Sequence, residues 1–320
     1  MPKGKIHLIQ SNAVTKKVHR SSLSKSIWRF RYFYLMLAPG IIYTVLFHYV
    51  PMGGLVIAFQ DYKVFLGLTG SKFVGFANFE RLFLTNKFLN VLSNTFIISG
   101  YKILFGFPAP ILLAILINEV RQRSFQRTVQ TVVYLPHFIS WVIMSGVVMN
   151  LLAPGDGLLN LIRIAMGQKP IFFMAEPGYF RSILVITDIW KEMGWSAVIY
   201  LAALSGVPQE IHEAAVIDGA NRIQRILYIA IPCILPTIAV MFLLRLGGVL
   251  NAGFDQVFSM YNSAVYDVGD ILDTYVYRIG VVDRKYGFST AVGLFKSVVA
   301  CAFVLIFNYL SDKAGQETLL

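Results

Sequence analysis

Charged residues are scarce in this 320-residue chain, and their scarcity decides its broad class. Asp, Glu, Lys and Arg make up 14% of the residues and apolar residues 56%, with a mean hydropathy of +0.63. Soluble domains carry about 25% charged residues. The apolar runs also lack the alternation of period two that strands of a membrane barrel need. The sequence therefore predicts a membrane protein made of helices.

The residue types that most enzymes and metal sites need are few as well. The two cysteines, Cys233 and Cys301, lie in apolar stretches, where we expect small buried side chains. The five histidines lack the spacing of zinc ligands. No Gly-x4-Gly-Lys-Ser/Thr loop occurs, so we expect no ATP hydrolysis by this chain alone. No nucleophile and base stand together in the apolar stretches, so we expect no catalytic residue, cofactor or metal.

Long apolar runs, in contrast, are abundant. A spanning helix needs about 20 mostly apolar residues, and runs of that length occupy 34–58, 93–117, 129–152, 181–206, 228–250 and 291–311. An unpaired backbone group in lipid costs several kcal/mol, which a helix avoids. We predict an all-α polytopic membrane protein with six transmembrane helices.

Positive charge collects at the N-terminus. Residues 1–31 contain eight Lys or Arg and no acidic residue, and basic residues beside a first span favour the cytoplasmic side. We therefore predict a basic cytoplasmic tail over 1–31, a six-helix domain over 32–312 and a cytoplasmic tail over 313–320. The net charge of +11 indicates topology and contact with anionic lipid. No nucleic-acid recognition module accompanies it.

The same orientation assigns the loops to the two sides of the membrane. With both termini inside, the inner loops are 118–128 and 207–227, and the longer segments 59–92, 153–180 and 251–290 face outward.

The inner loop 207–227 has the local chemistry of two short helices with a turn between them. Pro208 with acids after it is a helix-start signal, so Glu210–Ile217 is predicted as a helix. Asp218 and Gly219 end it, with Gly219 free to take positive φ. A second helical stretch is predicted to start near Asn221 and to continue into the fifth span.

The loop also carries a spaced motif, which consists of Glu213-Ala214-Ala215, then Gly219, then Ile229-Ala230-Ile231-Pro232. It resembles the signature of the integral-membrane permease subunits of ATP-binding-cassette (ABC) importers: Glu-Ala-Ala, three residues, Gly, nine residues, Ile-x-Leu-Pro. Ile231 in place of Leu conserves size and apolarity. The resemblance implies the type I ABC importer permease fold, with 207–227 as its coupling loop.

Further patterns narrow the resemblance to carbohydrate importers of the maltose-permease type, and to the subfamily for complex oligosaccharides and polysaccharide fragments. They are Leu201–Leu204, Ile211–Ala215, Ile217–Ala220, Phe73–Phe79 and Asn94-Thr95. The resemblance extends from about residue 30 to 312 and leaves out the basic tail.

The resemblance implies a set of partners and a place in the bacterial cytoplasmic (inner) membrane. The partners are a second permease subunit, two ATPase subunits that use ATP and Mg²⁺, and an extracytoplasmic sugar-binding protein. The coupling residues it implies are Glu213, Ala214, Ala215, Asp218, Gly219, Arg222 and Arg225. Glu213 would contact a groove of the ATPase, and Arg222 or Arg225 would add ion pairs. The alternative is an interfacial helix that only anchors in lipid headgroups.

Charges inside the spans form a second group of candidates, because a charged residue in a bilayer is costly and faces a cavity or a partner. Asp188, Lys191, Glu192 and Trp195 stand at i, i+3, i+4 and i+7, so they share one face of the fourth span.

Three further cations lie at similar depth. Counting about 1.5 Å per residue from the outer ends places Asp188 and Lys191 roughly 10 to 15 Å deep, Lys102 about 12 Å, and Arg245 and Lys296 about 8 Å. Four spans then contribute one polar layer with more cations than acids, and we infer a path for a polar, uronate-bearing oligosaccharide. The alternative is internal pairing, as of Asp188 with Lys191, with Arg245 and Lys296 snorkelling toward the surface.

An ion-coupled secondary sugar transporter is the competing function. It would use Asp188 and Glu192 as carriers of protons or sodium ions. Six spans with a docking helix fit the importer better, and no internal inverted repeat is evident in the sequence.

Overall fold

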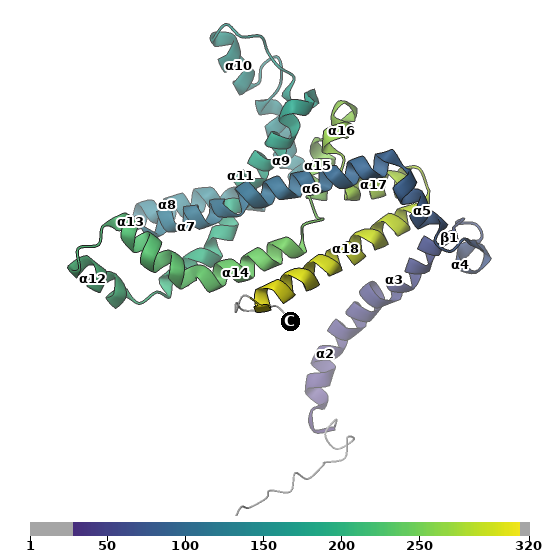
Figure 1. Ribbon diagram of the computed structural model, residues 1–320, viewed down its shortest axis with the longest axis horizontal. Coiled ribbons are helices and arrows are strands. Elements are labelled where there is room, and N and C mark those ends of the chain that lie inside the picture. Colours follow the sequence, from purple (N-terminus) through teal and green to yellow (C-terminus); the bar gives the residue numbers. More distant parts are fainter. Residues whose placement is uncertain (1–27, 314–320) are drawn as a thin grey trace, which may run out of the picture. The chain divides into compact units, whose positions relative to one another are not determined.

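The computed structural model describes residues 28–313 (Figure 1). Most of the predicted tails, residues 1–27 and 314–320, therefore lie outside the described part. The chain divides into two compact units, Met1–Gly54 and Leu55–Leu320, and each is described by itself.

The first unit contains most of the first predicted span, 34–58, up to Gly54. Helix α2 (Arg31–Thr44) continues through the π-turn η1 (Val45–Tyr49) into α3 (Val50–Met52). A proline inside a helix removes one hydrogen bond and clashes with the preceding turn. The π-turn ends two residues before Pro51 and accommodates this proline. No residue of these three elements is buried, so this surface is left to lipid or to a partner.

Helices dominate the second unit, and their bounds are as follows. The N-terminal part contains η2 (Gly53–Phe59, shared with the first unit), α4 (Gly67–Gly70), α5 (Ala77–Leu84), α6 (Asn86–Gly106), α7 (Pro108–Asn118), α8 (Arg123–Tyr134), η3 (Leu135–Phe138), α9 (Trp141–Leu151), α10 (Leu158–Ala165) and η4 (Phe173–Ala175). The remainder contains α11 (Pro177–Ser205), α12 (Gln209–Ile217), α13 (Arg222–Arg225), η5 (Ile226–Ala230), α14 (Ile231–Gly247), α15 (Phe254–Met260), η6 (Ser263–Val265), α16 (Tyr266–Gly269), α17 (Leu272–Tyr277), η7 (Arg278–Val282) and α18 (Tyr286–Lys313).

One small sheet lies outside the helices. Strand β1 (Gln60–Asp61) pairs antiparallel with β2 (Lys72–Phe73), with Gln60 opposite Phe73 and Asp61 opposite Lys72. The sheet follows the end of η2 and precedes α5.

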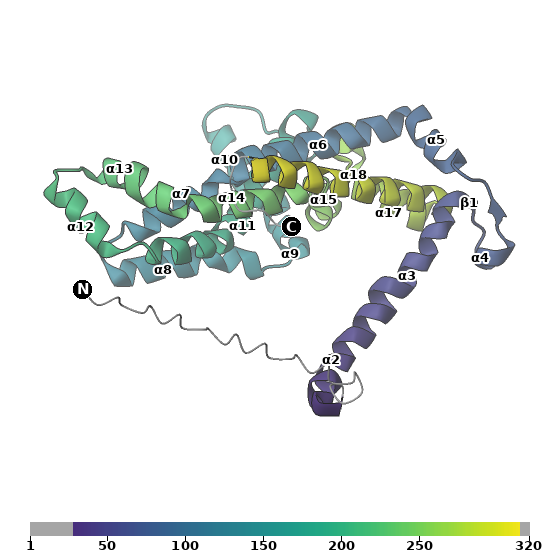
Figure 2. The same cartoon turned by 60° about the horizontal axis from the view of Figure 1, so that its bottom comes forward.

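Helix α11 is at the centre of the packing. It contacts α6, α7, α8 and α14, and α14 contacts α18. Figures 1 and 2 show these helices side by side, with α12 and α13 at one end and with α5 and α17 at the other. The loop 207–227 is therefore at the opposite end of the bundle from α5 and α17.

The predicted spans correspond to real helices. Four helices are long and apolar enough to cross a membrane: Arg31–Phe59, Asn86–Asn118, Arg222–Gly247 and Tyr286–Tyr309. The third predicted span is not straight, because Arg123–Phe138 and Trp141–Leu151 meet at 105°. The fourth is α11, whose 29 residues are long enough to span. Its four charged residues make it less apolar than the four helices named above. By length and composition, the described residues therefore contain up to five spans. The count of six stays a prediction.

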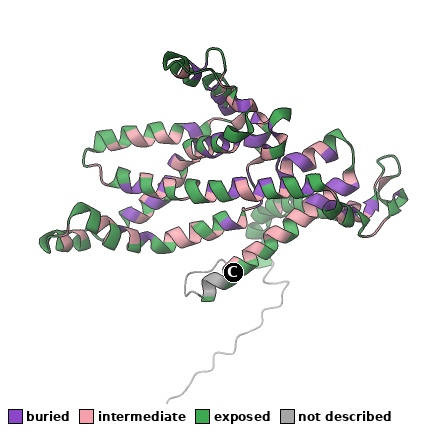
Figure 3. Cartoon of the chain, turned by 45° about the horizontal axis from the view of Figure 1, so that its top comes forward, coloured by how far each residue is buried: buried purple, intermediate pink, exposed green. Residues whose placement is uncertain are grey.

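Many large apolar side chains stay exposed on these helices, and Figure 3 shows exposed residues along most of them. Cys233 on α14 and Cys301 on α18 are both exposed, so our prediction of buried cysteines was wrong. A sequence shows that a residue is in a span but not whether its face meets another helix of the chain. In a membrane such faces meet lipid or another subunit.

Candidate functional site

Charged residues from three spans meet at one point of the second unit. Lys102 of α6 donates a hydrogen bond from Nζ to Asp188 Oδ1 of α11 at 3.0 Å, and Arg245 of α14 approaches Asp188 Oδ2 with Nη2 at 3.4 Å. The sequence placed all three at similar depth. The structure brings them into one ion-pair cluster around the carboxylate of Asp188.

Lys102 is fully committed within that cluster. Its ammonium also donates to the carbonyl of Ala252 at 2.9 Å and to Gln256 Oε1 at 2.5 Å, which uses all three donors of a lysine. Only 3% of the residue is exposed. Lys102 therefore holds α6 to α15, which contains Gln256, and it has no free donor for a further ligand.

Gln256 is a residue that the sequence analysis missed. Its side chain is fully buried and its Nε2 donates to the carbonyl of Leu184 at 2.7 Å and to Thr187 Oγ1 at 2.8 Å. The oxygen and the nitrogen of this buried amide are both hydrogen-bonded within the chain, so Gln256 holds the surrounding segments in position. Its place in the predicted outer segment 251–290 gave no sign that it would reach between the spans.

Lys191 and Glu192 form a separate group at the break in the third span. Lys191 Nζ donates to the carbonyl oxygen of His137 at 2.6 Å, and Glu192 Oε2 lies 2.8 Å from His137 Nδ1. Trp195 stacks on the His137 ring, with centroids 4.7 Å apart and planes at 2°. The shared face of α11 therefore supports the broken helix, where the backbone loses its usual hydrogen-bond partners.

The alternative pairing of Asp188 with Lys191 is not formed, because each is bound elsewhere. Asp188 is paired with Lys102 and Arg245, and Lys191 is 5% exposed and lies 3.6 Å from Glu192. Lys296 on α18 pairs with Asp273 of α17 at 2.5 Å. The expected single polar layer is thus split into three groups, because the direction in which each helix faces, and not depth alone, decides which charges meet.

Arg245 is the cation that remains accessible. Its side chain is 46% exposed, and it lines two neighbouring cavities. One, of about 260 Å³, also has Asp188, Glu192 and Tyr200 in its wall. The other, of about 160 Å³, has Lys102 and the hydroxyl of Ser99, which has no hydrogen-bond partner in the described residues.

The loop 207–227 has the predicted form. Helix α12 covers Gln209–Ile217, Gly219 has φ of +80°, and the amide of Ala220 donates to the carbonyl of Ala215 at 2.8 Å. This is the hydrogen bond that a glycine-ended helix makes. Asn221 caps α13 through a reciprocal bond with Gln224. Sequence and structure agree here because capping is local chemistry.

Most of the coupling candidates lie on the open surface of this loop. Glu213 is exposed, with Oε1 accepting a hydrogen bond from Gln209 at 2.9 Å. Ala214, Asp218 and Gly219 are exposed and Ala215 is half-buried. The side chains of Val216 and Ile217 are 54% and 86% exposed, so apolar as well as acidic groups of α12 are free to meet a partner.

The two arginines of the loop differ. Arg222 forms an ion pair with Glu119 at the end of α7 and also donates to the Glu119 backbone carbonyl at 2.5 Å. Arg225 Nε has no hydrogen-bond partner in the described residues. Arg222 therefore ties the loop to its own chain, whereas Arg225 is half-buried and its Nε atom is buried without a partner. Glu119 carried no motif, which is why the sequence did not reveal it.

These features together define a multi-pass membrane transport subunit with an exposed coupling loop at one end. The family model described as "Binding-protein-dependent transport system inner membrane component" matches residues 106–314. The chain belongs to this family of ABC importer permeases. It is a transport subunit of the inner membrane and not an enzyme, and permease subunits of this kind carry no cofactor.

Two curated relatives from Bacillus subtilis (strain 168) cover nearly the whole chain. Protein LplB is 43% identical over 291 residues, which is 91% of this chain and 92% of the relative. The polygalacturonan/rhamnogalacturonan transport system permease protein YteP is 42% identical over 304 residues, 95% of each.

A solved structure gives the same result for the fold. A chain in the crystal structure of a bacterial alginate ABC transporter, in complex with an alginate pentasaccharide-bound periplasmic protein, matches with a TM-score of 0.87 and 40% identity. The match covers 93% of this chain and 100% of that one. The protein thus has the type I ABC importer permease fold.

Proposed function

We propose that this chain forms half of the translocation path for an acidic, uronate-bearing oligosaccharide. It acts with a second permease subunit, two ATPase subunits that hold ATP and Mg²⁺, and an extracytoplasmic binding protein that delivers the sugar. Two relatives support the cargo class, since one is named for polygalacturonan and rhamnogalacturonan and the other for alginate, an acidic polysaccharide.

The observation that carries the acidic cargo is the position of Arg245. Its side chain stays 46% exposed although it is paired with Asp188, and it lines both cavities of the spans. Guanidinium binds carboxylates through paired hydrogen bonds. The side chains of Lys102, Lys191 and Lys296 are paired within the chain and only 4%, 7% and 22% exposed. The more exposed Arg245 is therefore the cation of this group assigned to cargo, with Glu192 and Trp195 beside the path.

A matched pair of sugars tests the cargo. An oligogalacturonate and its methyl ester share one backbone and differ in charge. We expect the reconstituted transporter to take up the acid in preference to the ester. Arg245→Gln should lower uptake of the acid about tenfold, because it removes one charge-assisted hydrogen bond to the sugar. Lys296→Gln is the control that removes a cation paired with Asp273. Equal uptake of acid and ester by the unaltered transporter contradicts the acidic cargo and leaves the permease role standing.

The coupling role rests on the exposed surface of α12. Glu213 is the residue proposed to enter the ATPase groove, with Ala214 and Ala215 allowing close approach and Gly219 fixing the turn. Arg225 supplies an ion pair to the ATPase. Contact with the ATPase requires the loop to lie in the cytoplasm. In this orientation the tails 1–31 and 313–320 are also cytoplasmic, and residues 32–312 form the transmembrane domain.

Co-purification of the ATPase with this chain tests the coupling role of Glu213. Purification from the native membrane in mild detergent should bring along the ATPase and the second permease. Glu213→Arg should remove the ATPase, whereas Glu210→Arg, an equal change on the same helix, should retain most of it. Retention of the ATPase by the Glu213 variant contradicts the assignment.

A further inference from the structure

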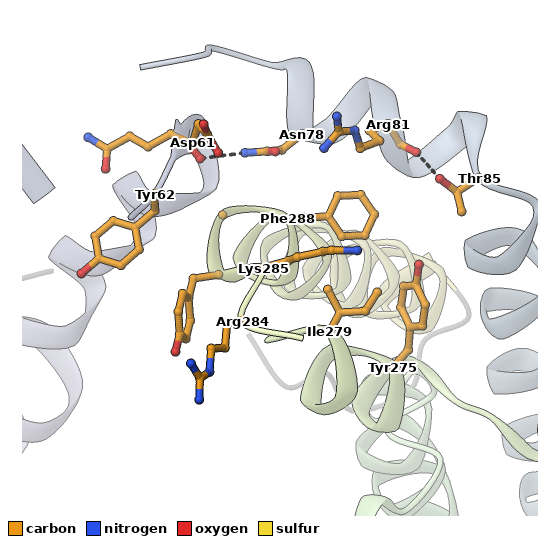
Figure 4. Close-up of a pocket in the computed structure, with 13 residues that line it drawn as sticks. Asp61, Tyr62, Asn78, Arg81, Thr85, Tyr275, Ile279, Arg284, Lys285 and Phe288 are labelled. Atoms are coloured by element: carbon orange, nitrogen blue, oxygen red, sulfur yellow. Dashed lines mark hydrogen bonds between the residues drawn. The ribbon is translucent and has the colours of Figure 1, made fainter. Parts of the chain in front are cut away.

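A cavity of about 550 Å³ lies at the end of the second unit opposite the loop 207–227. Figure 4 shows it between α5, the β1 segment and the start of α18. Its volume is in the range of small-molecule sites. It is separate from the cavities at Arg245, and neither the coupling loop nor the ion-pair cluster contributes a residue to it.

The wall of this cavity is rich in unpaired positive charge. Arg81 of α5, Arg284 and Lys285 line it, together with a single acid, Asp61. All three cations are exposed, and none forms an ion pair in the described part of the chain. In Figure 4, Lys285 extends between Arg81 above and Tyr275 below, and Arg284 lies at the rim. The arrangement attracts an anion.

The aromatic residues of the wall do not offset this charge. Tyr275 is 2% exposed, and burial raises the pKa of Tyr275 above its ordinary value of 10.0, so its phenol stays neutral. Tyr62 and Tyr286 meet edge to face with centroids 6.0 Å apart. Tyrosines with one apolar and one wet side are typical of the membrane interface.

The position of the wall residues along the chain also places the cavity at the membrane interface. The apolar helix Arg31–Phe59 ends one residue before Gln60, and the apolar helix Tyr286–Tyr309 begins with residues of the wall. The cavity is therefore at the level where two spans leave the hydrocarbon. Gly287 keeps these parts close, because a Cβ there would overlap the backbone oxygen of Gln60.

Exposed aromatic side chains in the segment that follows the cavity residues Gln60, Asp61 and Tyr62 point to a lipid. The hairpin between Gln60 and Ala77 exposes Phe65 at 102%, Phe73 at 67% and Phe76 at 68%. Exposed aromatics at this density mark a surface that meets lipid or a partner. Together with the basic wall they fit a molecule that has an anionic head and apolar tails.

The backbone at Arg284 adds an independent sign of function. Its φ is +57°, the only positive φ of a non-glycine residue in the described part of the chain. A non-glycine residue held in this region costs about 1 kcal/mol or more, and such residues cluster where ligands are held. Here the strain directs a guanidinium to the rim of the cavity.

We propose that this cavity binds the headgroup of an anionic glycerophospholipid, with its phosphate between Arg81 and Lys285 and with Arg284 at the rim. The tails lie against the exposed aromatics of the hairpin. The bound lipid links β1, α5 and the start of α18, on the side of the membrane opposite the coupling loop. This site does not depend on which sugar the transporter carries.

Native mass spectrometry of the delipidated, complete transporter tests the site. The probes are dioctanoyl phosphatidylglycerol and dioctanoyl phosphatidylcholine, which differ in net charge, and glycerol 1-phosphate, which has the phosphate without tails. We expect phosphatidylglycerol to bind in preference. One cation near a lipid surface contributes about 1 kcal/mol, so Arg81→Gln with Lys285→Gln should weaken binding about 25-fold.

Matched variants separate binding from folding. Lys87→Gln with Lys169→Gln removes the same charge from exposed residues outside the cavity wall, and should leave binding unchanged. Arg284→Asn removes the guanidinium and suits positive φ, so it should weaken binding about fivefold without lowering the unfolding temperature.

Four outcomes overturn the proposal. Equal binding of the two lipids excludes a headgroup-specific site, and equal loss in both double variants shows a general charge effect. Equal binding of glycerol 1-phosphate assigns the site to a soluble phosphate. Displacement of the lipid by an oligogalacturonate at lower concentration assigns it to cargo.

Discussion

The Nζ atom of Lys191 donates a hydrogen bond to the carbonyl oxygen of His137 at 2.6 Å, at the point where the third span bends by 105°. A bend leaves backbone groups without the partners that a continuous helix supplies, and lipid supplies none. The fourth span therefore provides, through one charged side chain, a bond that the third span lacks.

Replacing this lysine tests its structural role. Lys191→Met keeps the length of the side chain and removes the donor, which leaves the His137 carbonyl unsatisfied. We expect a loss of about 1–3 kcal/mol in stability, measured as a lower unfolding temperature of the purified transporter. Lys169→Met, at an exposed position between α10 and η4, should stay within about 0.5 kcal/mol. Equal stability of the two variants contradicts the role.

Gly194 gives a second prediction about the same pair of spans. A Cβ at Gly194 would overlap the backbone carbonyl of Val133 on α8, and a backbone cannot yield as a side chain can. Gly194→Ala should cost about 1–3 kcal/mol, the usual range for overpacking.

Gly106→Ala is the control for that change. Its Cβ would stand 3.6 Å from Ile189 Cγ1, an ordinary contact, and alanine favours a helix over glycine by about 0.5–1 kcal/mol. The unfolding temperature of the transporter should therefore hold or rise for Gly106→Ala and fall for Gly194→Ala. The opposite order would show that α8 and α11 are not packed as described.

The pair Glu119–Arg222 predicts an effect on coupling without an effect on assembly. It joins α7 to α13 at a site where the arginine side chain is 59% exposed, so its contribution to stability is about 0–1 kcal/mol. The Glu119→Ala variant should still assemble with the ATPase. The stimulation of ATP hydrolysis by the loaded binding protein should fall by up to about fivefold in the assembled transporter.

Charge reversal completes that test. Glu119→Arg and Arg222→Glu should each reduce stimulated ATPase activity, and the two together should recover part of it. No recovery in the double variant, measured beside both singles, would mean that the ion pair does not position the loop.

The coarse fold could be predicted because it depends on length and composition. The positions of the spans, the helix Gln209–Ile217 and the positive φ of Gly219 all follow from local rules. The break in the third span was missed, although Pro136 and the helix cap at Ser140 were visible signals. A run of apolar residues looks continuous whether or not it bends.

The candidate site could be predicted only as a set of depths. Depth along a helix follows from counting residues, so Lys102, Asp188 and Arg245 were placed at similar levels. Which of them pair depends on how each helix is rotated about its axis, and Gln256 reaches Lys102 from 154 residues away. Contacts of that kind are set by packing and leave no mark in a single sequence.

The π-turns before the prolines change the register of the helices that follow. Val45–Tyr49 ends two residues before Pro51, and Ile226–Ala230 ends two residues before Pro232. A π-turn inserts one residue into an α-helix, and one residue is a rotation of about 100°. Deleting a single residue between Ile226 and Ala230 would turn Arg222 by that angle relative to Arg245. The orientation of the loop 207–227 relative to Arg245 therefore depends on a single inserted residue.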